Sequence, residues 1–227
     1  MISIERVNLM KTNFKRCGAY IIDMLIVILI SLVISNICSS DYQLDNYKKN
    51  FDNVIKLTEK LEQDKITEKE YKKEYRKLSY ELDKNSTTTS FVLIACMIGY
   101  FGIFQYSQNG RTVGKRIFKL QVIKNGDGDL NIGNYLLRSL ILYNIIFTLT
   151  RLILIYTLKQ NAYMNYRDII SNVQTIVTII MVGSIFFSKE GRGLHDLIAG
   201  TKVKDLKIID EFQQGSKKVI EGEIIKK

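Results

Sequence analysis

A carboxylate lies inside the first long apolar segment of the chain. Asp23 stands in the stretch KRCGAYIIDMLIVILI, residues 15–30, and on a helix it lies roughly 9 Å past the basic edge of that stretch. A charged side chain within a membrane helix costs about 2.5 to 3.5 kcal/mol on insertion scales, so such residues usually face protein partners and often mark proton or ion pathways. Asp23 is therefore a candidate group for taking up a proton or a cation.

Charged residues from distant parts of the chain are candidates to join Asp23. Arg138 lies near the start of another apolar segment at a similar depth, and we expect it to be the counter-ion. Arg16 precedes Asp23 by about two helical turns and is expected to snorkel toward phosphate or to reach the loop SKEGRGLHDLIAGTKV. That loop contains His195 and Asp196. We predict a buried cluster of Arg16, Asp23, Arg138 and Asp196, with His195 either hydrogen-bonded at a helix end or relaying protons.

Four apolar segments must position these residues. About 20 predominantly apolar residues cross the hydrocarbon core of a bilayer, and residues 17–38, 87–108, 135–158 and 169–187 meet that criterion. The chain has no proline, so the interiors of these helices meet no breaker. The sequence predicts an all-α membrane protein: a four-helix transmembrane bundle over residues 1–206, followed by a charged cytoplasmic tail, residues 207–227.

Residues 41–86, between the first two spans, have the pattern of two amphipathic helices. Apolar residues recur at three and four positions through DYQLDNYKKNFDNVIKLTEKLEQ, and the pattern restarts in DKITEKEYKKEYRKLSYEL. Thr67 followed by Glu70 predicts a capping box at the start of the second helix. We therefore expect an inserted helical hairpin outside the cytoplasm, serving as a solvated spacer or binding a partner.

The block between the second and third spans is basic. Arg111, Lys115 and Arg116 form a loop that we expect to bind anionic lipid or to close the cytoplasmic mouth of the bundle. Its GRTVGK is not a phosphate loop, because Arg116 occupies the position where Ser or Thr would bind magnesium. The extended pieces KLQVIK and DLNI, separated by NGDG, predict a turn between two short strands.

Lys and Arg near the ends of the spans predict the orientation of the chain. Basic residues gather before the first span and in residues 109–134, so both termini are expected in the cytoplasm of a cell-membrane protein. Lysine near anionic lipid headgroups accounts for the net charge of +10, and a nucleic-acid partner is not needed. The partners that we expect are the bilayer and either a second copy of the chain or another membrane protein.

Three blocks of the sequence resemble the RDD family of membrane proteins, named for one arginine and two aspartates. They are RCGAYIID, then GRTVGKRIFKLQVIK with the following LLRSLI, and finally HDLIAGTKV. By this resemblance the naming residues are Arg16, Asp23 and Asp196, and the outer insert is longer than is usual in the family. The resemblance implies a bacterial or archaeal multi-pass membrane protein, with suggestions of transport.

Two functions follow from these residues. In the first, the protein is a transporter or ion-coupled carrier that uses the buried Asp/Arg cluster on the cytoplasmic side. In the alternative, it is a non-enzymatic membrane regulator or scaffold that binds a partner through the outer hairpin or the tail, and the cluster is a packing tie. We expect no enzymatic activity, because no nucleophile and base stand at credible positions. We also expect no cofactor and no metal, since the three cysteines lack metal-ligand spacing.

Overall fold

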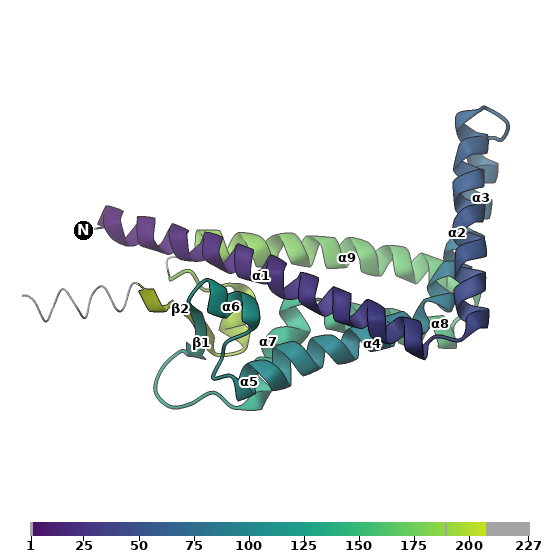
Figure 1. Cartoon of the computed structure of the whole chain (residues 1–227). Coiled ribbons are helices and arrows are strands. Elements are labelled where there is room, and N and C mark those ends of the chain that lie inside the picture. Colours follow the sequence, from purple (N-terminus) through teal and green to yellow (C-terminus); the bar gives the residue numbers. More distant parts are fainter. Residues whose placement is uncertain (1, 189, 208–227) are drawn as a thin grey trace, which may run out of the picture. The chain divides into compact units, whose positions relative to one another are not determined.

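The computed structural model describes residues 2–188 and 190–207, and this part of the chain is predominantly helical (Figure 1). Of the predicted tail, residues 208–227 lie outside the described residues. The described chain forms two compact units. Unit 1 contains residues up to Ile26, residues Ile98–Leu142 and residues from Ile179 onward; unit 2 contains Val27–Met97 and Tyr143–Thr178.

Three helical segments of the described chain are long and apolar enough to cross a membrane. They are Val7–Cys38 in α1 (Ile2–Cys38), Thr87–Ser107, and Gln160–Phe187, which is α9. The helices α7 (Ile132–Leu142) and α8 (Ile145–Thr157) pass the same test together as one broken pair, which makes up to four candidates. Side chains such as Ile176 and Ile179 on α9 are more than half exposed, as expected where lipid rather than protein covers an apolar helix.

The segment Thr87–Ser107 changes its helical geometry on the way. It begins as α4 (Thr87–Met97), continues as the π-helix η1 (Ile98–Phe104) and ends as α5 (Gln105–Ser107). A seven-residue π-helix is uncommon, and such departures occur frequently at functional sites. Within unit 1, η1 packs against α7.

The last long helix begins earlier than the sequence analysis predicted. The fourth apolar segment was expected to cover residues 169–187, but α9 already begins at Gln160. Its N-terminal turns are amphipathic: Tyr163 and Met164 pack with Ile155 of α8 in a buried core of unit 2, to which Tyr80 also contributes. Packing of one side of these turns against protein therefore extends the helix beyond its apolar run.

Unit 1 contains a small sheet, so the expectation of an all-α fold is corrected. The strand β1 (Leu120–Lys124) pairs antiparallel with β2 (Thr201–Asp205), with Val122 opposite Val203. The predicted partner of KLQVIK was the nearby DLNI, which forms no strand with it. The partner of β1 is instead β2, which comes directly after α10 (Leu194–Ile198). In this pairing Leu120 of β1 and Thr201 of β2 are fully buried. Between α5 and β1 lies the short helix α6 (Val113–Ile117).

The insert of unit 2 consists of α2 (Asp41–Glu62) and α3 (Glu68–Asn85), which pack on each other (Figure 1). The predicted capping box at the start of α3 is confirmed: Thr67 accepts from the backbone of Glu70, whose carboxylate in turn accepts from the Thr67 backbone at 2.9 Å. Arg76 of α3 pairs with Asp168 of α9 at 3.1 Å. The insert is thereby attached to the last long helix.

Candidate functional site

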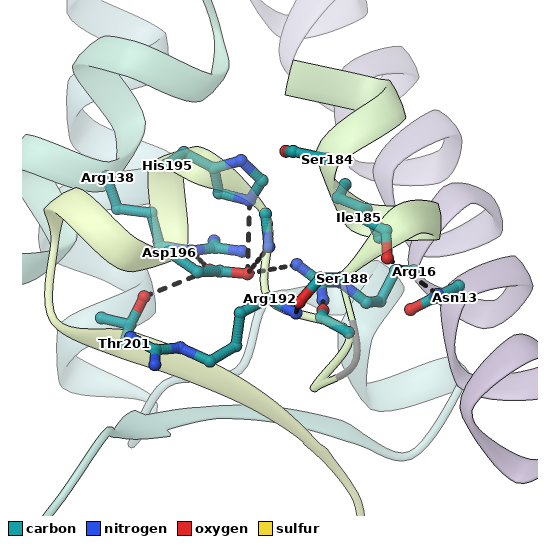
Figure 2. A network of polar contacts seen from close by, with 12 residues as sticks. Asn13, Arg16, Arg138, Ser184, Ile185, Ser188, Arg192, His195, Asp196 and Thr201 are labelled. Carbon is teal, nitrogen blue, oxygen red and sulfur yellow. Dashed lines mark hydrogen bonds and ion pairs between the residues drawn. The ribbon is translucent and has the colours of Figure 1, made fainter. Parts of the chain in front are cut away.

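The first carboxylate of the candidate site, Asp196 on α10, is enclosed by donors from several elements. Arg138 of α7 donates from Nε at 2.8 Å, Thr201 from Oγ1 at 3.1 Å, and the backbone of Gly193 at 3.3 Å. Arg16 of α1 donates from its guanidinium to Oδ2, the oxygen that also accepts from Gly193, whereas Arg138 and Thr201 donate to Oδ1 (Figure 2). Asp196 is completely buried. It therefore ties α1, α7 and β2 to one helical turn.

The charge of Asp196 is fixed by its neighbours. Burial alone would raise the pKa of this carboxyl, but the guanidinium groups of Arg138 and Arg16 hold it well below its usual range. Arginine does not lose its proton in proteins, so both partners stay charged at every physiological pH. The group of Asp196, Arg138 and Arg16 is therefore a permanent ionic network.

The loop between α9 and α10 closes over Arg16. The Arg16 guanidinium also donates to the carbonyl of Gly191, which has a φ of +65°. This backbone angle favours glycine, and a Cβ at Gly191 would in addition lie 2.5 Å from Cδ1 of Leu9 on α1, so that the leucine side chain would have to shift. Asn13 donates to the carbonyl of Ile185 at 3.1 Å, on the same face of α1 (Figure 2). These contacts hold the end of α9 on the N-terminal half of α1.

His195 lies beside this network without a charge. Burial, aided by the positive charge of Arg138, lowers the pKa of His195 to about 3. Its Nε2 lies 3.5 Å from Asp196 Oδ2, and within the described residues neither ring nitrogen has a hydrogen-bond partner. At neutral pH the imidazole is therefore neutral. Of the two roles that we expected, the hydrogen bond at a helix end is not found in the described chain.

The second carboxylate, Asp23, meets mostly neutral donors. Tyr100 of η1 donates its hydroxyl to Oδ1 at 2.8 Å, the backbone of Gly114 donates to the same oxygen at 2.7 Å, and Thr112 donates its hydroxyl to Oδ2. Tyr100 also accepts from the backbone of Val113 at 3.1 Å. Asp23 is completely buried. The carboxylate thus binds the first turn of α6, where backbone amide groups are unpaired within the helix.

Glycine at position 114 lets the backbone of α6 come close to α1. A Cβ there would lie 2.4 Å from the carbonyl oxygen of Ala19 and 2.9 Å from Cγ of Asp23. Both neighbours belong to α1, and a backbone carbonyl cannot turn aside as a flexible side chain can. The sequence TVGK therefore lets α6 lie directly on α1, with Thr112 as its N-cap.

A buried lysine supplies the positive charge near Asp23. Lys115 Nζ lies 3.8 Å from Asp23 Oδ2, 3.2 Å from Thr112 Oγ1 and 5.9 Å from the ring centre of Phe101. Its side chain is 8% exposed. Burial, aided by the positive charge of Arg138, lowers the pKa of Lys115 to about 7, although Asp23 opposes the shift. Unlike an arginine, this partner can lose its proton near neutral pH.

The expected ion pair between Asp23 and Arg138 is corrected by these contacts. Arg138 pairs with Asp196, and Lys115 pairs with Asp23. Depth along two helices matched Asp23 to Arg138, but depth does not fix the direction in which each side chain leaves its helix. The predicted cluster therefore consists of two adjacent carboxylate sites, linked electrostatically because Arg138 and Asp196 both act on Lys115.

Comparison with known proteins places the chain in a family. Its sequence matches the model of the RDD family over residues 11–200, most of its length. The chain belongs to the RDD family. No curated protein and no solved structure matches it. In this RDD protein, two of the residues that the resemblance identified as the naming ones, Arg16 and Asp196, contact each other, while Asp23 holds α6.

The three basic residues predicted to form a lipid-binding loop have different environments in the RDD chain. Arg116 is exposed and donates to Gln108, and Arg111 is half-buried. Lys115 is buried against Asp23, so it is not available to lipid, and for this residue the expectation is corrected.

Several residues of the RDD site were missed because they carry no charge. Tyr100, Thr112, Gly114 and Thr201 all donate to the two carboxylates. The expected partners of the two carboxylates were arginines alone, so Lys115 was not expected beside Asp23 either. Thr112 and Gly114 belong to the segment GRTVGK. A threonine directly before a short helix is a typical N-cap, and this pattern was the signal that could have identified them.

Within the described residues, no three His, Cys, Asp or Glu side chains gather as they would around a metal ion. The side chains of this RDD site offer two buried carboxylates, one permanently neutralised by arginine and one facing a lysine that can be deprotonated.

Proposed function

We propose that this RDD protein is a multi-pass carrier that exchanges protons for monovalent cations, with Asp23 and Lys115 as the coupling pair. The observation that carries the proposal is the position of Asp23, a buried carboxylate on the first candidate span whose charged partner is a buried lysine. Intramembrane carboxylates are the usual coupling groups of ion carriers. The proposal requires no enzymatic step and no cofactor.

The two carboxylates would then have separate tasks. Asp196 is held by two arginines that keep their charge, so it serves as the fixed tie between helices. Asp23 is held by the hydroxyl groups of Tyr100 and Thr112 and by Lys115. Because these hydroxyl groups are neutral, the charge of Asp23 must be balanced by Lys115 or by a bound cation.

Charge balance leads to exchange at this site. When Lys115 is protonated, its ammonium group neutralises Asp23 and a cation gains little by binding. When Lys115 releases its proton, the negative charge of Asp23 attracts one monovalent cation in its place. One proton therefore leaves for each cation that binds. The lowered pKa of Lys115, about 7, centres this competition near neutral pH.

The charged groups around Lys115 set the pH at which a cation can replace its proton. Arg138 and Arg16 lower its pKa, while Asp23 and Asp196 raise it. The π-helix η1 carries Tyr100 and Phe101, which lie against Asp23 and Lys115 respectively. A stretch of π-helix at this place would give the second candidate span a point at which its geometry can change between ion-bound and proton-bound states.

Flux in liposomes tests the proposal. Purified protein is reconstituted, and sodium, potassium and proton fluxes are measured between pH 6 and 9. We expect exchange to rise with pH through about 7, as Lys115 loses its proton. Asp23→Asn removes the site's charge and should abolish exchange. Lys115→Met should leave cation binding but remove its pH dependence, while the exposed lysine variant Lys204→Met should behave like the wild type.

The proposal fails if the assembled wild type moves no ion, or if Asp23→Asn assembles and exchanges ions at the wild-type rate. Assembly is checked by size-exclusion chromatography and circular dichroism of every variant. If Asp23→Asn fails to assemble, the charge-preserving Asp23→Glu decides the matter: coupling should shift in pH with this variant, whereas a packing role predicts loss of assembly alone.

A second function has an observation in its favour. No residue of α2 is buried, and Tyr42, Tyr47 and Phe51 on this helix are between 41% and 76% exposed. Such a face outside the candidate spans suits a regulator or scaffold that binds another protein. In that case, replacing Tyr47 and Phe51 by serine should remove the biological function while leaving ion flux and assembly unchanged.

The proposed carrier is a cell-membrane protein with both termini in the cytoplasm. Support comes from the lysine and arginine residues that gather before the first span and between residues 109 and 134. The Asp23 site then lies toward the cytoplasmic side, and the α2–α3 insert lies outside. Anionic lipid headgroups are its expected surroundings, and a second copy or another membrane protein is its expected partner.

A further inference from the structure

A polar cavity of about 270 Å³ lies within unit 2, apart from the carboxylate sites. It is bordered by the end of α3, the first turn of α4, and parts of α8 and α9. Most of its wall is formed by hydrogen-bonding side chains, and the residues that matter below are Asp83, Ser90, Thr148, Arg151, Arg167 and Ser171. A cavity lined by so many hydrogen-bonding side chains is suited to polar contents.

Charge in this cavity is unbalanced. Asp83 is already engaged, since Tyr163 donates to it at 2.9 Å and Arg167 Nε lies 3.4 Å from the same oxygen. Arg151 stands in α8 and has one hydrogen bond in the described chain, a long one of 3.5 Å to Thr148. No carboxylate of the described residues forms an ion pair with it. One positive charge therefore remains without a counter-ion.

An unpaired arginine in a candidate membrane span is costly. Arginine at such positions normally pairs with an acid or faces a water-filled cavity. Here the guanidinium faces the cavity, and the hydroxyl groups of Ser90 and Ser171 also border it without a hydrogen bond in the described part of the chain. Two arginines, one carboxylate and free hydroxyl donors form a site with a net charge that a single anionic charge would balance.

We propose that this cavity binds a singly charged phosphate group, with Arg151 as its main ligand and with Arg167, Ser90 and Ser171 as further donors. The planar fork of a guanidinium matches two phosphate oxygens at once, which a spherical ion such as chloride cannot use. The hydroxyl groups supply donors for the remaining oxygens. The cavity is large enough for a phosphate with accompanying water.

Two sources can supply this group: the headgroup of a phospholipid, or inorganic phosphate and its esters. Arg151 lies about 9 Å along α8 from Thr157, the last residue of that helix. Its neighbours Ile153 and Tyr156 are 62% and 68% exposed, and tyrosine commonly lies at the headgroup level of a bilayer. The phosphate chemistry is shared, and the experiment must distinguish the two sources.

Binding is measured on the full purified chain in a phosphate-free detergent buffer. One arm titrates inorganic phosphate by calorimetry, and the other adds phosphatidylglycerol and counts retained lipid by native mass spectrometry. A diacyl glycolipid without phosphate serves as the lipid control. We expect at least one arm to bind. Arg151→Gln should weaken that binding at least about tenfold, since it removes a charge-assisted hydrogen bond, while Arg76→Gln, an arginine outside the cavity, should not.

The outcomes separate the sources and decide the proposal. Phosphate binding that depends on Arg151 indicates a free phosphate or ester, and lipid binding that depends on Arg151 indicates a headgroup. If Arg151→Gln does not fold by circular dichroism, the pair Ser90→Ala and Ser171→Ala should weaken the same binding. Equal binding by wild type and the folded cavity variants, or no binding in either arm, overturns the proposal. Ion flux through the Asp23 site is not expected to depend on Arg151.

Discussion

At the scale of single residues, two aspartates of one chain have been given different chemistry by their neighbours. Asp196 faces two arginines, and its charge cannot be changed without breaking the network. Asp23 faces hydroxyl groups, one backbone amide and a lysine. The difference between a guanidinium, which keeps its proton, and an ammonium, which can release it, separates a structural role from a proposed coupling role.

The neutral His195 leads to a prediction about acid stability. Its pKa is about 3 in the folded protein and about 6.5 when the chain is unfolded. Between these values the unfolded state binds a proton that the folded state does not, so stability should fall as the pH drops below about 6.5. At pH 5 the loss from this residue should be about 2 kcal/mol.

The variant His195→Phe should remove that acid dependence. It keeps a ring in the buried site and eliminates two nitrogens that lack hydrogen bonds in the described chain, so stability at pH 7.5 should be unchanged or higher. The measurement is apparent melting temperature in detergent from pH 7.5 to 5 for both proteins. An equally steep decline in His195→Phe would show that other groups cause the acid loss.

At the scale of elements, the short helix α6 is positioned by one carboxylate and one glycine. Five residues make a helix too short to be stable alone. Asp23 supplies an acceptor for its first turn, and Gly114 lets its backbone touch α1. The element is therefore formed by its docking, and through Lys115 it carries the proposed proton-binding group.

Adding one methyl group should undo this docking. Gly114→Ala places a Cβ 2.4 Å from the Ala19 carbonyl oxygen, so α6 must move away from α1. We expect a loss of about 1 to 3 kcal/mol in stability, the usual cost of overpacking, together with loss of ion exchange. Gly99→Ala is the matched control, because nothing lies within 4 Å of the Cβ that it adds. Equal melting temperatures and fluxes in the two variants would show that α6 is not held in this way.

At the scale of the whole molecule, the orientation in the membrane decides which solution reaches each site. Cys38 is exposed at the C-terminal end of α1, and the other two cysteines can be replaced by serine. In that background we expect a membrane-impermeant maleimide to label Cys38 in intact cells. A cysteine placed at Lys204 in a chain with no other cysteine should be labelled only after permeabilisation. The reversed pattern would place the termini outside.

The secondary structure of this RDD chain could largely be predicted from sequence, whereas part of its pairing could not. Long apolar runs without proline predict helices, and the Thr67–Glu70 capping box is a local signal that the structure confirms. The strand at KLQVIK was predicted, but its partner lies some 80 residues away in sequence at Thr201–Asp205. Local signals identify an element, while its partner depends on which surfaces remain to be buried after the helices have packed.

In the candidate site, too, the sequence identified residues but not their partners. The sequence identified Asp23 as a charge too costly to leave unpaired in an apolar segment, because that cost depends on residue type and depth. It also predicted that Arg16, Arg138 and Asp196 lie at a similar depth. Only the tertiary structure decided that Arg138 faces Asp196, that Lys115 faces Asp23, and that neutral donors complete both sites. The direction in which a side chain leaves its helix depends on helix rotation and packing, and these are properties of the folded chain rather than of any one segment.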